Sequence, residues 1–89
     1  MTEYTVSRIL NSYNQVQIKH DTIEFHNFGV DKQRLRCNQI ESINLKNNTI
    51  FSELIIDTYS SRYNIRTRKQ KAMQIYNDIQ KMKNTLLDT

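Results

Sequence analysis

Apolar and polar residues alternate near the start of the chain, and this pattern predicts a β-hairpin. Val16 and Ile18 belong to the first run, and Ile23 and Phe25 belong to the second. A tight turn at residues 20–21 places Ile18 opposite Ile23 and Val16 opposite Phe25, so both apolar pairs share one face. The other face is expected to be a polar outer surface that carries Gln15, Gln17, Glu24 and His26.

Further runs of apolar and β-branched residues, separated by turn signals, predict about seven strands in all. The densest run covers residues 50–58, and the run with Ile40, Ile43 and Leu45 has the spacing of a bent or bulged strand. A turn every 8–12 residues or so is typical of a small sandwich or barrel. The remaining strands are expected at residues 4–10, 33–37 and 62–66, with a turn at 27–29.

The period changes to three and four residues after position 66, which predicts an amphipathic helix over residues 68–86. Thr67 and Gln70 have the Thr-x-x-Gln spacing of a capping box at its start. A helix with one apolar stripe buries that stripe, so this helix is expected to cover an end or face of the sheet. The stripe consists of Ala72, Ile75, Tyr76, Ile79, Met82 and Leu86.

The order of these elements resembles the pleckstrin-homology-like fold, and the chain is most similar to the small bacterial members of that superfamily. Three stretches between residues 4 and 86 carry the resemblance: Val-Gln-Ile-Lys-His-Asp-Thr-Ile-Glu-Phe at 16–25, Gln-Ile-Glu-Ser-Ile at 39–43, and Tyr-Asn-Ile-Arg-Thr at 63–67 with Lys-Gln-Lys-Ala-Met-Gln-Ile-Tyr at 69–76. The resemblance implies a mainly β, α+β domain. Its expected form is a small sandwich or partly open barrel of about seven antiparallel strands, closed by one C-terminal helix.

The same resemblance implies a binding platform for lipids, peptides or other proteins, and no catalysis. Members that bind phosphoinositides carry a basic Lys…Lys/Arg-x-Arg pattern on the first hairpin. Here Arg8 and Lys19 are present and no other residue completes that pattern. A phosphoinositide site is therefore not favoured.

The length of 89 residues favours a single domain over residues 1–89. No apolar run approaches the ~18–20 residues that cross a bilayer, and the first ten residues do not resemble a signal peptide. Cys37 is the single cysteine, and a small domain without disulfides suits a reducing cytoplasm. Richness in Asn, Lys and Ile is typical of an AT-rich genome and suggests a bacterial or phage context.

Residues with catalytic or metal-binding chemistry are few. His20, Asp21, Glu24 and His26 are the one group with metal-type side chains, and their spacing does not match the usual zinc motifs. A polar surface with an exposed turn is the favoured interpretation of that group. Cys37 lies on the apolar side of its run, which favours a small core residue over a nucleophile. We therefore expect no enzyme, no cofactor and no metal.

Positive charge is concentrated toward the C-terminus. Residues 1–61 carry six Lys/Arg and seven Asp/Glu, a net charge of −1, whereas residues 62–89 carry seven Lys/Arg and two Asp/Glu, a net charge of +5. Cations in the first turn of a helix oppose its macrodipole, which makes their placement there a candidate for function. The alternative is a solvated surface that maintains solubility. The partner-binding candidates are Arg62, Arg66, Arg68, Lys69, Lys71, Arg34, Arg36 and Tyr63.

Two functions from different classes follow from these features. The leading hypothesis is a non-catalytic module for protein–protein interaction, which offers a sheet edge, a loop set or the basic surface to a partner, including an acidic one. A homodimer formed through the same edge is a variant of it. The second hypothesis is a binder of anionic ligands, either nucleic acid or an acidic membrane surface, through the basic C-terminal region.

Overall fold

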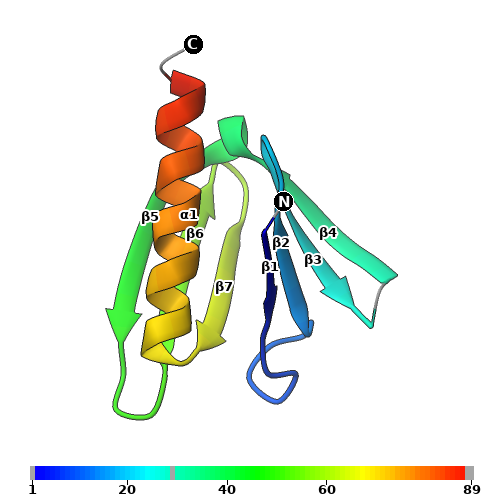
Figure 1. The fold of residues 1–89 in the computed structure, drawn as a ribbon, viewed down its shortest axis with the longest axis vertical. Helices are drawn as coiled ribbons and strands as arrows, with labels where there is room; N and C mark the ends of the chain where they lie inside the picture. Colours follow the sequence, from blue (N-terminus) through cyan, green and yellow to red (C-terminus); the bar gives the residue numbers. More distant parts are fainter. Residues whose placement is uncertain (1, 29, 88–89) are drawn as a thin grey trace.

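Two antiparallel sheets and one helix make up the part of the chain that the computed structural model describes, residues 2–28 and 30–87. The strand orders are β1-β2-β3-β4 and β5-β6-β7, so hydrogen-bonded neighbours are consecutive in sequence. Helix α1 runs across the second sheet (Figure 1). The elements are β1 (Thr2–Thr5), β2 (Gln15–Ile18), β3 (Thr22–Asn27), β4 (Val30–Arg36), the 3-10 turn η1 (Cys37–Gln39), β5 (Ile40–Asn47), β6 (Ser52–Thr58), β7 (Arg62–Thr67) and α1 (Lys69–Leu87).

Both sheets and the helix share one hydrophobic core. Phe25 of β3 stacks on Tyr63 of β7, with ring centroids 5.6 Å apart, and so joins the two sheets. Ile75 and Ile79 of α1 are fully buried in the same cluster. The expected fold class is confirmed, because the described residues form seven antiparallel strands in two sheets that do not close into a barrel, followed by one helix.

The β2–β3 hairpin has the predicted register. Ile18 lies opposite Ile23 and Val16 lies opposite Phe25, and all four side chains are buried. A backbone hydrogen bond of 2.8 Å between the residues that flank His20–Asp21 closes the predicted two-residue turn. Alternation of side chains along a strand is sufficient for this prediction, because a slip of one residue would expose the whole apolar set.

Several strand ends differ from the prediction. β1 ends at Thr5 instead of residue 10, and β6 begins at Ser52 instead of residue 50. Cys37, predicted as the end of a strand, begins η1. The predicted irregularity at the start of β5 is confirmed by a register shift between Ile40 and Ser42. Gly29, part of the predicted turn at 27–29, lies outside the described residues.

Helix α1 begins and ends one residue later than predicted. The carbonyl of Arg68 accepts a backbone hydrogen bond of 2.9 Å from the N–H of Ala72. Arg68 is therefore the N-cap residue, so the capping box predicted with Thr67 at the N-cap is wrong. Thr67 instead completes β7 and is buried. The predicted stripe is buried at Ala72, Ile75, Ile79 and Met82 and half-buried at Tyr76, while the side chain of Leu86 lies outside the described residues.

Among residues 2–28 and 30–87, no helix has the length and apolar character needed to cross a bilayer.

Candidate functional site

The two candidate arginines of β7 are paired with acidic residues of β6. Arg62 Nε lies 2.7 Å from a carboxylate oxygen of Asp57, and Arg66 Nε lies 2.9 Å from a carboxylate oxygen of Glu53. In both pairs the residues lie directly opposite each other on the two strands. Opposite charges in that position stabilise a sheet. Much of the positive charge that the sequence places on β7 is therefore neutralised locally.

Tyr63, a candidate for partner binding, packs against the core. Its ring plane lies within 2° of the plane of Phe25, and its side chain is half-buried. One face of the ring is therefore occupied. Tyr59, four residues earlier, is exposed in the β6–β7 turn.

Glu24 lies at the centre of a charged cluster on the outer face of the first sheet. Its carboxylate lies 3.0 Å from Lys19 Nζ, 2.9 Å from His26 Nε2 and 3.0 Å from Arg34 Nε. Glu24 and His26 are both buried, so the prediction that this face is an exposed polar surface is wrong for these two residues. The physical reason is that the long side chains of Lys19 and Arg34 reach across the sheet and cover the carboxylate.

The electrostatics of this cluster favour a structural role. The hydrogen bond from Lys19 is the largest influence on the pKa of Glu24 and lowers it; burial acts in the opposite direction, and His26 and Arg34 lower the pKa further. A carboxylate compensated by three nitrogen groups has little capacity left for a metal cation. Within the described ranges, no group of three or more His, Cys, Asp or Glu side chains is arranged to hold a metal ion.

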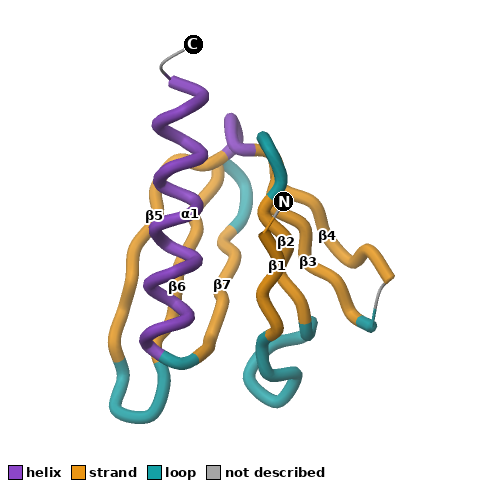
Figure 2. The backbone as a smooth tube through the Cα atoms, viewed as in Figure 1, coloured by secondary structure: helices purple, strands orange, loops and turns teal. Residues whose placement is uncertain are grey.

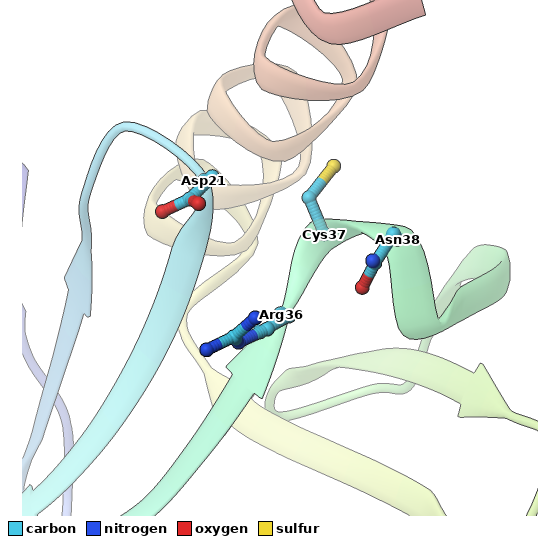
Figure 3. A pocket seen from close by; sticks show the side chains of 4 residues that line it. All are labelled: Asp21, Arg36, Cys37 and Asn38. Atoms are coloured by element: carbon cyan, nitrogen blue, oxygen red, sulfur yellow. The ribbon is translucent and has the colours of Figure 1, made fainter.

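Arg36 and Cys37 line a cavity of about 260 Å³ together with Asp21 and Asn38. In Figure 3 the Cys37 sulfur points toward α1, whereas the Arg36 side chain extends away from it. Burial raises the pKa of the Cys37 thiol, which lowers the thiolate fraction near neutral pH. The cavity therefore holds a cysteine suited to packing, as the sequence predicts, and poorly suited to nucleophilic chemistry.

Arg68, Lys69 and Lys71 lie at the start of α1, where Arg68 and Lys69 are exposed. Arg68 and Lys71 line a second cavity of about 530 Å³. Most of the exposed surface of this cavity is apolar. The other lining residues come from the end of β1, the β1–β2 loop, the β5–β6 loop and the end of β7: Thr5, Val6, Ser7, Leu10, Ile50, Phe51 and Thr67. We call the surface formed by residues 6–14, 48–51 and 68–71 the loop end.

Sequence reasoning missed the apolar part of the loop end. Ile9, Leu10 and Ile50 are apolar residues at the ends of predicted strands, and the prediction placed them inside those strands. In the structure they lie in loops. Their position next to Asn11 and Asn48, which are turn-forming residues, is the signal that could have placed them outside the sheets.

The outer edge of β7 is closed by the β1–β2 loop. The side-chain amide of Asn11 donates to the carbonyl of Arg66 at 2.8 Å and accepts from the N–H of Arg66 at 2.9 Å, as a neighbouring strand would. The Tyr13 hydroxyl donates to the carbonyl of Asn64 two residues further along the edge. These contacts also explain why β1 ends early, because the chain turns toward β7 to make them.

The start and the middle of α1 contact the edge strand β1. Lys71 Nζ donates to the carbonyl of Thr5 at 2.7 Å. The Tyr4 hydroxyl donates to the carboxylate of Asp78. Burial, together with the Asp78 carboxylate, raises the pKa of Tyr4 to about 12, so the hydroxyl retains its proton and the hydrogen bond.

The outer edge of β5 remains open in the described part of the chain. β5 pairs with β6 alone, in a regular register from Ser42 to Asn47. Backbone groups of successive residues in a strand point to opposite sides. The backbone N–H and C=O of Arg66 face outward on β7, so those of the preceding residue, Ile65, face its partner Leu54 on β6. The backbone groups of Leu54 therefore point toward β7 and away from β5. Leu45, the partner of Leu54 on β5, consequently directs its N–H and C=O to the outer edge.

Comparison of the chain with protein-family models, with curated proteins and with solved structures finds no match. The resemblance to the pleckstrin-homology-like family stays a prediction. The open edge of β5 and the loop end are the two candidate binding surfaces of the described residues.

Proposed function

We propose that this protein is a non-catalytic binding module that receives an extended segment of a partner protein along the outer edge of β5. The observation that supports it is the contrast between β5 and the other three edge strands. Side chains from other elements bond to outer backbone groups of β7 and to the Thr5 carbonyl of β1, and β4 is interrupted by a register shift opposite Phe25 and His26. β5 has a regular open edge from Ser42 to Asn47. An unpaired edge of this length is a template for strand addition. Self-pairing through the same edge, which would give a homodimer, is the variant of this proposal.

The absence of catalysis is part of the proposal. The Cys37 thiol is buried and its pKa is raised, and the carboxylate of Glu24 is held by three nitrogen groups. Both features disfavour a nucleophile or an acid–base catalyst. Seven antiparallel strands followed by one helix also support the proposed membership of the pleckstrin-homology-like family, and the single cysteine supports a place in the cytoplasm.

The alternative is a binder of anionic ligands that uses the basic C-terminal region. Because Arg62 and Arg66 are paired with acidic residues, the support for this alternative comes from the cations at the start of α1. Nucleic acid is the weaker ligand, because the ring of Tyr63, which could otherwise stack on a base, is stacked on a core residue. Binding to nucleic acid would weaken steeply with rising salt, whereas strand addition would not.

Leu45 offers a matched test of strand addition. Leu45→Pro removes the N–H that points away from β6, while Leu45→Ala shortens the half-buried side chain even further and keeps that N–H. A tagged wild-type protein is used to capture its partner at moderate salt, and the partner is identified by mass spectrometry. We expect that partner to be retained by Leu45→Ala and lost from Leu45→Pro.

One outcome contradicts the proposal. Equal retention by both variants would place binding elsewhere than the β5 edge. If sedimentation shows that the wild type is a dimer that Leu45→Pro dissociates, the homodimer variant of the proposal holds in place of a foreign partner.

A further inference from the structure

The loop end is cationic without any acidic side chain in its own segments. Residues 6–14, 48–51 and 68–71 contain four cations and no Asp or Glu. Members of all three segments line the same cavity, so the segments are adjacent in space. Figure 2 shows both loops at the end of the molecule where α1 begins. The four cations are Arg8, Arg68, Lys69 and Lys71.

Exposed apolar side chains protrude from the same end. Ile9 is 95% exposed and Ile50 is 89% exposed, and each lies in a different loop. Phe28, also exposed, joins this surface through Arg8, whose guanidinium carbon lies 4.6 Å from the centre of the Phe28 ring. Single exposed apolar residues are common on proteins, but a group of them among unopposed cations marks an interaction surface.

We propose that the loop end docks onto an anionic membrane surface, with Ile9 and Ile50 in the interfacial region and the cations near lipid phosphates. Interfacial binding combines burial of apolar side chains with attraction between basic residues and anionic lipids. The loop end supplies both components at one end of the molecule. This role goes beyond strand addition, gives the anionic-ligand alternative a definite ligand, and uses a surface separate from the β5 edge.

Other occupants fit this surface less well. A second copy of the chain would bring two cationic ends together, which is electrostatically unfavourable. Nucleic acid is held by stacking of bases on aromatic rings, whereas the most exposed side chains here are aliphatic. Anchors of protein interfaces are enriched in aromatic side chains such as Trp and Tyr, whereas the most exposed apolar side chains here are the isoleucines Ile9 and Ile50.

Flotation with lipid vesicles tests the proposal directly. The probes are vesicles of phosphatidylcholine alone and of phosphatidylcholine mixed with phosphatidylglycerol. We expect retention on the anionic vesicles at low salt, weak retention on the neutral vesicles, and loss of binding near 1 M salt, where the Debye length is about 3 Å. No retention on anionic vesicles at low salt, or equal retention on both kinds of vesicle, overturns the proposal.

The contribution of Ile9 and Ile50 to membrane binding has a matched control in Tyr59, at the opposite end of the molecule. Ile9→Asp and Ile50→Asp should each lower the vesicle partition coefficient about tenfold. Tyr59→Asp introduces the same charge at a side chain that is 83% exposed in the β6–β7 turn, and it should change binding far less. Because all three positions are exposed, the variants should fold, which circular dichroism checks. If Tyr59→Asp lowers the vesicle partition coefficient as much as Ile9→Asp and Ile50→Asp do, the loop end is not the membrane-facing end and the proposal is wrong.

The contribution of the cations is tested with two double variants that change the net charge by the same amount. Arg68→Glu/Lys69→Glu should weaken binding to anionic vesicles by about 25-fold or more, since each cation near such a surface contributes about fivefold. Arg36→Glu/Lys81→Glu changes the net charge equally at exposed positions away from the loop end. If the two double variants bind equally weakly, attraction depends on total charge alone and the proposal is wrong.

Discussion

The charged cluster around Glu24 should contribute measurably to the free energy of unfolding, and Glu24→Gln tests this. The variant preserves the side-chain size and removes the negative charge. The side chain of Glu24 is 5% exposed, but Lys19 is 40% exposed and Arg34 is 59% exposed. Loss of one partner from a fully buried pair costs about 3–5 kcal/mol. Because both cations reach solvent, we expect a smaller loss of about 1–2 kcal/mol.

Urea unfolding at neutral pH measures this loss. The midpoint should decrease while the dependence of the free energy on urea stays unchanged. The melting temperature should fall by about 4–8 °C for each kcal/mol in a domain of this size. Glu41→Gln is the matched control, because Glu41 is an exposed glutamate of β5. Its effect should stay within about 0.5 kcal/mol.

The pH dependence has a defined sign. The pKa of Glu24 is lower in the folded protein than its ordinary value. The stabilisation is therefore present above the unfolded pKa, near 4.3, and is lost as the pH falls through the folded pKa. The stability of the wild type should approach that of Glu24→Gln in acid. Equal stability of the two proteins at neutral pH, or a difference that persists in strong acid, would refute this reasoning.

Two further predictions concern the β7 edge and the cysteine. Asn11→Ala should lower the free energy of unfolding by about 1–3 kcal/mol, because it leaves the N–H and C=O of Arg66 without their partner; an unchanged urea midpoint would contradict this account of the edge. The Cys37 thiol should react with a thiol-specific reagent much more slowly in the folded protein than in denaturant, because burial raises its pKa. Equal rates in the two states would show that the thiol is accessible in the fold.

The period of the apolar residues predicts much of the local structure. The β2–β3 hairpin has the predicted register at every pair, and α1 lies within one residue of its predicted bounds. These elements are well predicted because their apolar residues must lie on one face, and a shift of one position would expose that face. The bulge near Ile40 was visible for the same reason, as a break in alternation.

Strand ends and the state of charged residues were less predictable. Ile9 and Ile50 have the composition of strand residues, and their exposure follows from the path of loops that the apolar pattern does not specify. Glu24 and His26 were expected on an exposed face, and their burial requires Lys19 and Arg34 to lie over them. Arg62 and Arg66 were predicted as candidates for partner binding, whereas the register of β6 and β7 supplies each with an acid.

Local sequence therefore determines which segments become strands or helix, because side-chain period and backbone propensity act within a few residues. Tertiary structure decides which edges stay open and which charges stay unpaired. Asn11 closes the edge of β7 at a residue 55 positions away, and Lys71 covers β1 across a separation of 66. Such contacts form only when the two sheets and α1 pack together, so they leave no periodic signal in the chain. The open edge of β5 and the cationic loop end are consequences of that packing.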